Sequence, residues 1–455
     1  MKIALINPPL ALDECTLRVT GTLPPLGLMN ISAVLEDRGH AVQIIDAAAN
    51  QYGAEATAGM VLEGSPDVIG ITSMSSNFCM ATEIASCLRK RCRALIVLGG
   101  MHATAMTRDC LDAGLFDYVV AGEGEYSFAQ LVDNLCAGKD DEIPGVCCIK
   151  DGRCRINRPE IITKLSDLPV RSWHLVDIKK YRPSPASYRM EPSVSTMISR
   201  GCPNSCIFCA SAAIFGRGFR PHAMHQIRKE LQILKNNRIR DINFVDINFA
   251  GNREHTKMVS RLLGDLGFAW NITTRCDTVD EELLGIMHEN GCYQIGYGIE
   301  AGSQETLDRI GKNYTIENIR KAVRITKKAE IEVKCYFTLG YPWQDKADIR
   351  KTIEFAKELN PHVVTFTIVN PYPGAQLFER VHGTIADSHY LNMTHRSATF
   401  NVSEHFNEKE LISMMNNAYR EIYMSPRHII QSFMSIKSYA DVKKLITAAE
   451  FVLQR

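Results

Sequence analysis

The sequence predicts an α/β protein with an amino-terminal doubly wound domain, an open partial (β/α)6 barrel and a helical carboxyl-terminal segment. Three observations predict this fold class. The chain has 455 residues, which allows about three units of roughly 150 residues each. Near the amino terminus, short apolar runs bounded by Gly and Asp alternate with amphipathic stretches, as in parallel strands buried on both faces. A second alternation begins near residue 196 and offers six strand candidates, fewer than the eight of a closed barrel.

The amino-terminal unit is expected to contain five strands with helices between them. The strand candidates are continuous apolar runs, and the helix candidates have apolar residues at helical spacing. The predicted strands span residues 2–7, 41–46, 68–72, 94–99 and 117–121, and the predicted helices span 27–38, 81–92 and 126–135. A connector follows over residues 141–194, with a small hairpin (147–150 and 154–156) around Asp151-Gly152 and an irregular stretch marked by Pro183, Pro185 and Pro192.

The second alternation predicts the partial barrel and the helical end of the chain. The strand candidates are residues 196–199, 242–245, 270–274, 294–299, 332–338 and 363–369, with helices at 281–289, 315–328 and 346–359. Further helices are expected at 408–423 and 440–453. These patterns place the predicted boundaries at 1–140, 141–194, 195–380 and 381–455.

Composition excludes several classes of protein. Hydrophobic residues make up 45% and charged residues 23%, which excludes disorder as the main state. The formal net charge of +1 provides no basic excess for a nucleic-acid partner. No apolar stretch reaches the ~20 residues of a membrane span, and Pro8 and Pro9 interrupt the first apolar run, so that it is interpreted as a strand rather than a signal peptide. The odd count of 15 cysteines favours reduced thiols and a cytoplasmic location.

The strongest chemical signal is a cysteine motif. Cys202, Cys206 and Cys209 follow a predicted strand at a C-x3-C-x2-C spacing. Three cysteines cannot complete a tetrahedral zinc site, whereas a [4Fe-4S] cluster held by three cysteines keeps one iron open for an external ligand. Two alternatives remain at this point: cysteines packed in the core as small hydrophobic residues, and a zinc site completed by a distant histidine.

This motif, with the aromatic Phe208 before its last cysteine, resembles that of the radical S-adenosylmethionine (SAM) enzymes. The resemblance implies that the open iron chelates the amino and carboxylate groups of SAM. One electron from the cluster then cleaves the sulfonium and releases a 5′-deoxyadenosyl radical. The similarity extends over about residues 195–380, through segments 244–249, 270–275, 298–304, 336–342 and 370–374.

The same resemblance implies a set of SAM contacts at the ends of the barrel strands. Asp246 and Asn248 would accept from the ammonium, Arg275 would pair with the carboxylate, and Glu300 would hold hydroxyls or the amine. The full set of implied contacts is Phe208, Asp246, Asn248, Arg275, Glu300, Ser303 and Tyr336. The alternative for each polar residue is a solvated or capping role. Cys276, Cys292 and Cys335 lack a second ligand spacing and are interpreted as core thiols.

The amino-terminal unit resembles the Rossmann-like cobalamin-binding domain that precedes many radical SAM cores. The segments that carry this resemblance include Asn7-Pro8-Pro9, Gly99-Gly100-Met101-His102-Ala103 and Gly122-Glu123-Gly124-Glu125. Glycines at strand ends let the backbone approach a large flat ligand. The implied cobalamin contacts are Pro9, Thr72, Ser73, Gly99, Gly100, Gly122 and Glu123. The alternative is a doubly wound domain without a cofactor.

Two departures from these families matter. No Asp-x-His-x-x-Gly run occurs, and His102 is interpreted as a loop residue, so the resemblance implies cobalt without a protein histidine beneath it. This arrangement suits a corrinoid that cycles through cob(I)alamin. The second departure is Tyr341-Pro342-Trp343-Gln344, which stands where relatives commonly have a Gly-Glu-Thr turn and leaves the shape of that loop open.

Together the resemblances imply a cobalamin-dependent radical SAM methyltransferase that acts on an unactivated carbon of a small or hydrophobic metabolite. One SAM would yield methylcobalamin, and a second would yield the radical that activates the substrate. The enzyme alternative is the same architecture without methyl transfer, as in an oxidative cyclase or a rearrangement of a tetrapyrrole or natural-product precursor. The non-enzyme alternative is a corrinoid or iron–sulfur sensor. A flavodoxin or ferredoxin is expected to supply electrons.

Overall fold

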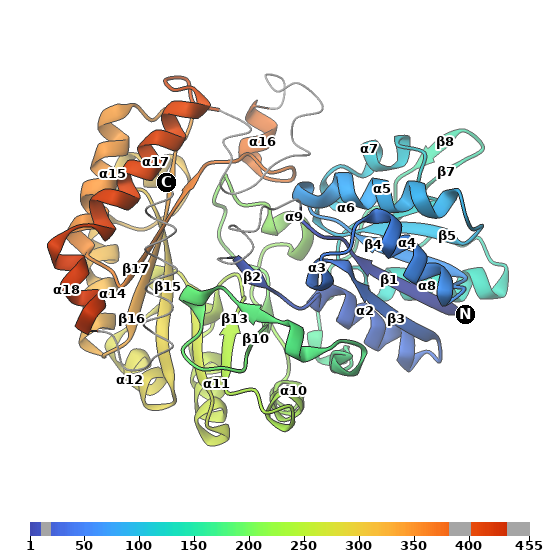
Figure 1. Cartoon of the computed structure of the whole chain (residues 1–455), viewed down its shortest axis with the longest axis horizontal. Helices are drawn as coiled ribbons and strands as arrows, with labels where there is room; N and C mark the ends of the chain where they lie inside the picture. Colours follow the sequence, from blue (N-terminus) through green and yellow to red (C-terminus); the bar gives the residue numbers. More distant parts are fainter. Residues whose placement is uncertain (11–19, 382–401, 435–455) are drawn as a thin grey trace.

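The computed structural model describes residues 1–10, 20–381 and 402–434. It contains two α/β units side by side, with the amino-terminal unit at the right of Figure 1 and the partial barrel at the left. The carboxyl-terminal helices α17 (Glu408–Tyr423) and α18 (Pro426–Met434) lie on the side of the barrel remote from the amino-terminal unit (Figure 1).

The amino-terminal unit is built on a seven-stranded sheet in the order β3-β1-β4-β5-β6-β7-β8. The first five strands in this order are parallel, and β7 and β8 join antiparallel. The hairpin expected in the connector therefore extends this sheet. The strands are β1 (Lys2–Asn7), β3 (Ala41–Asp46), β4 (Val68–Thr72), β5 (Leu95–Gly99), β6 (Tyr118–Val120), β7 (Val146–Lys150) and β8 (Arg153–Arg155).

Helices cover both faces of this sheet, and β1 shows why its sequence is apolar throughout. Ile3 and Leu5 pack in the cluster that contains residues of α2 and α8, whereas Ala4 and Ile6 pack in the cluster that contains residues of α4 and α5. Because successive side chains point to opposite faces, both faces of the strand must be hydrophobic. The helices are α2 (Leu26–Asp37), α4 (Ala54–Glu63), α5 (Phe78–Arg89) and α8 (Gly124–Ala137), with short α3 (Ala47–Asn50), α6 (Met101–Ala105) and α7 (Thr107–Asp112).

The second unit is an open barrel whose six parallel strands follow one another in chain order, β10-β13-β14-β15-β16-β17. The predicted partial (β/α)6 barrel is confirmed. The strands are β10 (Ser193–Thr196), β13 (Asp241–Phe244), β14 (Ala269–Thr274), β15 (Cys292–Glu300), β16 (Glu332–Leu339) and β17 (Val363–Ile368). The helices are α9 (Ser211–Phe215), α10 (Met224–Asn236), α11 (Arg253–Leu266), α12 (Glu281–Glu289), α13 (Gln304–Arg309), α14 (Ile316–Lys328), α15 (Lys346–Leu359) and α16 (Gln376–Val381).

The first barrel strand differs from the prediction of residues 196–199. The chain leaves the sheet after Thr196, because the Ile198 N–H donates to Asp246 (3.2 Å) instead of a neighbouring strand. Ser199–Arg200 (β11) then pairs antiparallel with Arg220–Pro221 (β12). A second two-residue pair joins Gly21–Thr22 (β2) to Arg182–Pro183 (β9). Such short pairs are too brief to leave a periodic signal.

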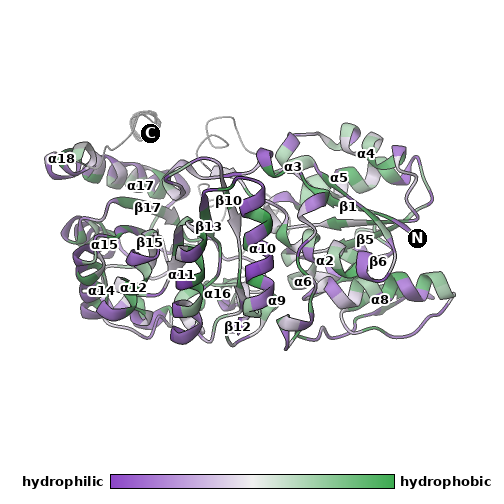
Figure 2. Cartoon of the chain, turned by 90° about the horizontal axis from the view of Figure 1, so that it is seen from below, coloured by the Kyte–Doolittle hydropathy of each residue, from purple (hydrophilic) through white to green (hydrophobic). Residues whose placement is uncertain are grey.

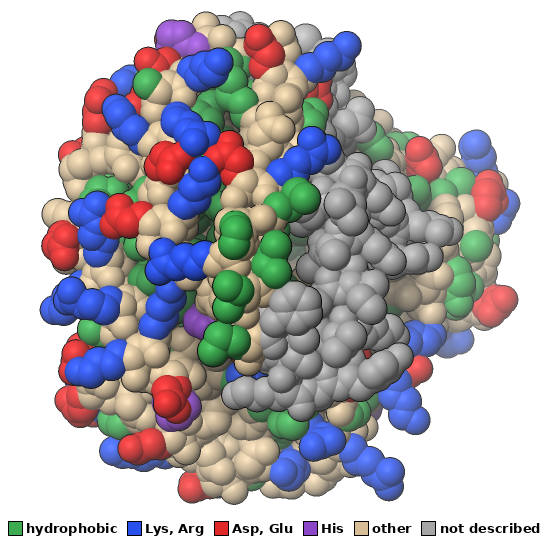
Figure 3. All heavy atoms as spheres, turned by 60° about the vertical axis from the view of Figure 1, so that its left-hand side comes forward, with side chains coloured by type: hydrophobic (Ala, Val, Ile, Leu, Met, Phe, Trp, Pro, Cys, Tyr) green, Lys and Arg blue, Asp and Glu red, His purple; other side chains and the backbone are tan. Residues whose placement is uncertain are grey.

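The outer face of the barrel carries many charged and polar side chains. Figure 2 shows hydrophobic residues on the strands and hydrophilic residues on the outer turns of α10, α11 and α14. Lys, Arg, Asp and Glu are interspersed over the face in Figure 3. In the described ranges, no helix has the length and apolarity to cross a membrane. The predicted helix at 408–423 is present as α17, and the one at 440–453 lies outside the described residues.

Candidate cofactor sites

The three motif cysteines lie in the loop between β11 and α9, which hydrogen bonds hold from two sides. The Ile207 N–H donates to Ile310 O (3.0 Å), and the Leu377 N–H donates to Ile207 O (2.8 Å). Gly201 opens the loop with a φ of +79°, and a Cβ there would lie 2.2 Å from Gly218 O. Only glycine fits this entry, because a side chain would collide with backbone.

The donor set of this loop fits a cluster better than a single metal ion. Cys202, Cys206 and Cys209 are free thiols of intermediate exposure. Among the residues whose positions are described, no three His, Cys, Asp or Glu side chains converge on a point that could hold one ion. A [4Fe-4S] cluster uses one cysteine for each of three irons, so its ligands need not converge.

A buried ion pair lies beside the cluster loop and was missed by sequence reasoning. Lys312 Nζ lies 3.1 Å from Glu300 Oε1, and the Thr338 hydroxyl donates to Glu300 Oε2 (2.9 Å). Burial raises the pKa of the Cys206 thiol, and the Lys312 cation opposes this. Lys312 follows Gly311, whose carbonyl oxygen lies 3.8 Å from Cys206 Sγ. Nothing in the sequence around Lys312 predicts that it lies near Cys206, because the two residues are far apart in the chain and only the fold brings them together.

Glu300 is held in an unusual backbone conformation. Its φ is +69°, which a non-glycine residue rarely adopts, and it lies where the pairing of β15 with β16 shifts register. A Cβ on Gly298 would lie 2.8 Å from Glu300 Oε1 and 3.1 Å from Lys312 Nζ, so glycine makes room for the ion pair. Strain of this kind gathers at functional sites.

Most of the implied SAM contacts lie at or just beyond the carboxyl ends of the barrel strands, where the Arg275 N–H donates to Asn248 Oδ1 (3.4 Å). Asn248 Oδ1 accepts from the Thr274 hydroxyl (2.7 Å). Arg275 pairs with Asp277 (2.8 Å) and donates to the Lys312 carbonyl (2.6 Å). Arg275 and Glu300 therefore meet at Lys312. Contact with SAM stays a prediction for each of them.

Other implied SAM contacts have local partners. Asp246 accepts from the Ile198 N–H and the Ser199 hydroxyl, so it anchors the chain just before the cysteine loop. Burial raises the pKa of Asp246 to about 6, against the opposing effect of these bonds. Ser303 caps α13 by accepting from the Thr306 N–H (3.2 Å), which is the capping alternative. The Tyr336 ring lies 5.1 Å from Lys334 Nζ, and Phe208 lies edge-on to Tyr341 with 6.2 Å between ring centres.

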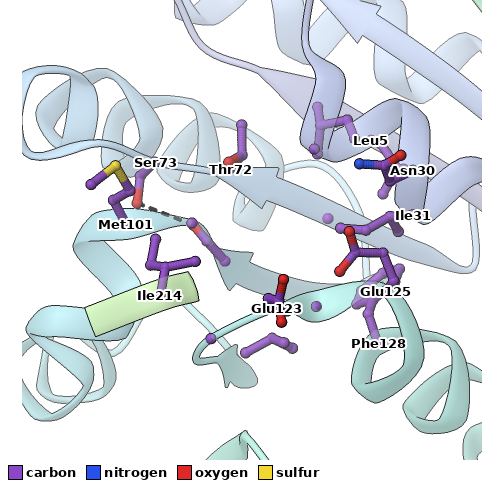
Figure 4. Close-up of a pocket in the computed structure, with 18 of the residues that line it drawn as sticks. Leu5, Asn30, Ile31, Thr72, Ser73, Met101, Glu123, Glu125, Phe128 and Ile214 are labelled. Atoms are coloured by element: carbon purple, nitrogen blue, oxygen red, sulfur yellow. Dashed lines mark hydrogen bonds between the residues drawn. The ribbon is translucent and has the colours of Figure 1, made fainter. Parts of the chain in front are cut away.

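A second site is a cavity of about 270 Å³ at the carboxyl edge of the amino-terminal sheet. Figure 4 shows its lining from α2, from the ends of β4, β5 and β6, and from α9. Of the seven implied cobalamin contacts, six line it: Thr72, Ser73, Gly99, Gly100, Gly122 and Glu123. Pro9 is buried but does not line this cavity.

The cavity's lining offers an acceptor to a ligand that carries amide groups, and cobalamin carries such groups. Asn30 points from α2 into the cavity (Figure 4), and its Oδ1 is buried without a hydrogen-bond partner. A ligand amide would supply the missing donor, because buried polar atoms are normally bonded. Gly100 has a φ of +98°, and a Cβ there would lie 2.5 Å from Ser73 O. The cavity edge therefore exposes backbone rather than side chains.

No histidine lines this cavity within the described chain. His102 was expected in a loop, but it lies in α6 because Gly100 turns the chain directly into that helix. The ring packs on Phe78 (4.2 Å between centres), and Nδ1 lies 3.1 Å from Ser75 Oγ. Burial lowers the pKa of His102 to about 4. The described residues 1–10, 20–381 and 402–434 therefore place no histidine in the wall of this cavity.

The loop with the unusual sequence Tyr341-Pro342-Trp343-Gln344 is closed by its own glutamine. Gln344 Oε1 accepts from the Gly340 N–H (2.9 Å) and the Tyr341 N–H (3.1 Å). The side chain thus satisfies two backbone donors at the end of β16 and fixes a tight turn. The loop shape that the sequence left open is an ordered turn.

Comparison with known proteins places both sites in described families. The B12 binding domain model matches residues 15–132, and the radical SAM superfamily model matches residues 196–356. An uncharacterized methyltransferase of Pyrococcus horikoshii is 31% identical, over 95% of this chain and 94% of its own. Cytidylyl-2-hydroxyethylphosphonate methyltransferase of Streptomyces wedmorensis is 26% identical, over 91% and 88%. The anaerobic magnesium-protoporphyrin IX monomethyl ester cyclase of Cereibacter sphaeroides is 26% identical, over 89% and 68%.

Solved structures share the fold. The cobalamin-dependent SAM radical enzyme OxsB with aqua-cobalamin bound covers 99% of this chain and 71% of its own, with a TM-score of 0.75 at 16% identity. The radical SAM methyltransferase TsrM of Kitasatospora setae, with cobalamin and a [4Fe-4S] cluster bound, covers 84% and 75%, with a TM-score of 0.69 at 18% identity. At these identities the likeness shows the fold.

Proposed function

Because the chain belongs to the cobalamin-binding radical SAM enzymes, we propose that it is a methyltransferase acting on an unactivated carbon of a small or hydrophobic metabolite. Its cofactors are a [4Fe-4S] cluster, SAM and cobalamin. We assign residues 1–140 to cobalamin and 195–380 to the radical SAM core, with 381–455 as the carboxyl-terminal segment. Residues 141–194 form the connector, which adds β7 and β8 to the amino-terminal sheet and enters the first barrel strand at Ser193.

One observation carries this proposal: the cavity on the amino-terminal sheet is completed by residues that flank the cysteine motif. Met197 and Arg200 precede the cysteines, Ile214 and Phe215 follow them, and all four line the cavity. Gly374, in the loop after β17, also approaches both units: a Cβ there would lie 3.0 Å from Ala213 Cβ and 3.4 Å from Ala105 Cβ. Residues on both sides of the cysteine motif therefore border the cavity, which supports a cluster and a cobalamin that face the same space.

Different residues of this chain would serve the cluster site and the cobalamin site. The cluster with SAM supplies a substrate-activating radical, and cobalamin supplies a methyl carrier. Cys202, Cys206 and Cys209 would hold the cluster, and Lys312 would place a positive charge beside it. The glycine-rich edge would seat the corrin ring against backbone, with Asn30 accepting from a ligand amide. Enclosure between the units would exclude water from the radical.

The mouth of the cavity favours a substrate with an apolar part. Met74 and Met101 line the cavity and remain 45% and 39% exposed. Methionine side chains are flexible and adapt to irregular apolar shapes. This supports a hydrophobic substrate or substrate fragment near the cobalamin site.

The test is anaerobic reconstitution with iron, sulfide and hydroxocobalamin, followed by SAM and a chemical reductant, with products measured by mass spectrometry. Methyl transfer yields S-adenosylhomocysteine and 5′-deoxyadenosine. Formation of 5′-deoxyadenosine alone would contradict methyl transfer. It would favour the second candidate, a cyclase or rearrangement, which the similarity to the magnesium-protoporphyrin cyclase supports.

Matched cysteine variants control this experiment. Cys206→Ala should abolish SAM cleavage because it removes a cluster ligand. Cys292→Ala removes a fully buried thiol on β15 outside the motif and should retain cleavage. Cleavage by the Cys206→Ala enzyme would refute the cluster assignment.

We further propose that a flavodoxin or ferredoxin reduces the cluster, since SAM cleavage requires an electron. Each protein, with its reductase, should replace the chemical reductant in the same assay. Cleavage with the chemical reductant but with neither protein would contradict this partner.

A further inference from the structure

Four buried charged residues join the cobalamin cavity to the cysteine loop. Arg200 donates to Glu123 Oε1 (2.8 Å) and to Glu125 Oε1 (2.5 Å). Arg220 donates to Glu123 Oε2 (2.8 Å). The side chains of Arg200, Glu123 and Glu125 are between 1% and 5% exposed, and that of Arg220 is 13% exposed. Glu123 is the N-cap of α8 and Glu125 lies in the first turn of that helix, whereas the arginines come from β11 and β12.

The charges in this network balance, so its geometry is strongly held. Two carboxylates face two guanidinium groups, and the loss of either partner would leave a buried charge uncompensated. Glu123 also accepts from the Ile162 N–H (2.9 Å) and from a second Arg220 nitrogen (3.1 Å). Its four acceptor positions are thus filled by the protein. Glu123 therefore builds the cavity wall rather than offering an acceptor to a ligand.

The same residues belong to both cofactor sites. Glu123, Glu125 and Arg200 line the cavity, where Figure 4 shows the two glutamates on the lower side. Arg200 is also the residue directly before Gly201 and Cys202. Its backbone is fixed by pairing with Arg220, and Gly201 packs against the Gly218 carbonyl. A shift in the Arg200 side chain therefore affects the cavity wall on one side and the start of the cysteine loop on the other.

We propose that Arg200 is a positioning residue that couples the two cofactor sites, so that a loaded cluster strengthens cobalamin binding and bound cobalamin stabilises the cluster. The proposal rests on the cofactors of the proposed function but not on methyl transfer. Because the network holds the cavity wall and the start of the cysteine loop in one arrangement, a cofactor that stabilises this arrangement at one site favours binding at the other. Such coupling is reciprocal by thermodynamic necessity.

The test compares the affinity of hydroxocobalamin for enzyme with and without the reconstituted cluster, by anaerobic absorbance titration in the absence of SAM. In the native sequence the cluster should tighten binding by at least about fivefold, the lower end of typical coupling. Glu125→Gln removes one charge of the network. In this variant the ratio of the hydroxocobalamin affinities with and without the cluster should fall below about twofold. The reciprocal measurement is cluster loss to an iron chelator, which bound hydroxocobalamin should slow in the native enzyme and not in the variant.

A matched control separates coupling from general loss of stability. Arg171 and Glu230 form another buried pair (2.6 Å), with side chains 2% and 10% exposed, outside the network. Glu230→Gln should preserve the ratio of affinities even where it lowers the melting temperature. Should Glu125→Gln fail to fold, Arg200→Lys keeps the charge but loses the guanidinium fork, and it should lower the ratio in the same way.

Three outcomes would overturn the proposal. A native ratio near one, or equal weakening of both affinities in Glu125→Gln with the ratio unchanged, would show that the network is structural only. Absence of any hydroxocobalamin binding would refute the cofactor assignment of the cavity and the coupling together. The ratio of affinities is measured without SAM. If methyl transfer fails while this ratio stays as expected, only the proposed methyltransferase reaction is refuted, and the coupling stands.

Discussion

At the scale of single residues, the buried Lys312–Glu300 pair controls the charge next to the cluster loop. Burial lowers the pKa of Lys312, but the opposing effect of Glu300, supported by Tyr314 and Cys206, raises this pKa above its usual value, so the lysine stays charged. Reduction adds a negative charge to the cluster. A nearby cation therefore stabilises the reduced form, and a nearby carboxylate destabilises it.

This charge arrangement predicts opposite shifts in the reduction potential of the cluster. Lys312→Met should lower the potential and Glu300→Gln should raise it, each on the order of 60 mV, a tenfold change for one electron. The double variant should return towards the native value because the local charge is balanced again. Potentials are measured by redox titration followed by electron paramagnetic resonance. Lys328→Met, which removes an exposed lysine paired with Glu281, is the control. Shifts of the same sign in both single variants would contradict the electrostatic role.

His102 predicts a pH dependence of stability. Burial lowers its pKa from 6.5 to about 4, so the unfolded chain binds a proton more readily than the folded one. Its contribution to stability is present above pH 6.5 and is lost as the pH falls towards 4. Between pH 7 and pH 5 this loss is about 2 kcal/mol.

Denaturant titrations at the two pH values check the effect of His102. His102→Asn keeps a side-chain group near Ser75 but cannot take up a proton, so it should lose about 2 kcal/mol less than the native enzyme between pH 7 and pH 5. The exposed His288 provides the control variant His288→Asn, which should follow the native enzyme. If the native enzyme and His102→Asn lose the same free energy of unfolding between pH 7 and pH 5, His102 is not the source of the pH dependence.

At the scale of elements, the turn from β5 into α6 forms the edge of the cobalamin cavity. Gly100 has a φ of +98°, and an added Cβ would lie 2.5 Å from Ser73 O and 2.8 Å from Ser73 N. Gly39 has a similar φ of +81°, but nothing lies within 4 Å of its added Cβ. An alanine at Gly39 would therefore suffer backbone strain alone, whereas an alanine at Gly100 would suffer the same strain and a collision with Ser73.

Alanine at these two positions should have different effects on cofactor binding. Both substitutions should cost about 1–2 kcal/mol of stability because an L-residue is strained at positive φ. Gly100→Ala should also weaken hydroxocobalamin binding more than about tenfold, since its Cβ displaces the end of β4, whereas Gly39→Ala should bind within about twofold of native. Equal affinity of the two variants would exclude a role of this turn in the cavity.

The elements also show what the sequence could predict. The strands at 2–7, 41–46 and 68–72 match β1, β3 and β4 in both bounds, because buried parallel strands are apolar on both faces and the signal is local. The cysteine motif is equally local. Asn30, Arg200 and Lys312 carry no such signal, because the contacts that matter come from distant parts of the chain, as in the pairing of Arg200 with Glu123. Sequence reasoning therefore identified the motif, the glycine edge and the glutamates Glu123 and Glu300, but not the cations that pair with them.

At the scale of the whole molecule, an open barrel must protect the two edges of its sheet. The β10 side lies towards the amino-terminal unit, and β17 forms the opposite edge (Figure 1). Two tyrosines of α17 cover that edge. Tyr419 Oη accepts from the Phe366 N–H (2.9 Å) and donates to the Phe366 carbonyl (3.0 Å). Tyr423 makes the same pair of bonds with Val364 (3.0 and 2.9 Å).

The two hydroxyls thus replace the partner that a seventh strand would provide, which predicts a specific cost for their removal. Tyr419→Phe and Tyr423→Phe keep the rings but leave a buried N–H and carbonyl unpaired at each position, so each should destabilise the enzyme by about 1–3 kcal/mol. The double variant should also self-associate, because the exposed edge can pair with another chain. Thermal unfolding and light scattering measure the two effects. Hydroxocobalamin binding should be unchanged in the folded double variant, since α17 lies on the side of the barrel remote from the amino-terminal unit (Figure 1) and contributes no residue to the cavity lining. A double variant with native stability would show that the sheet edge does not depend on these hydroxyls.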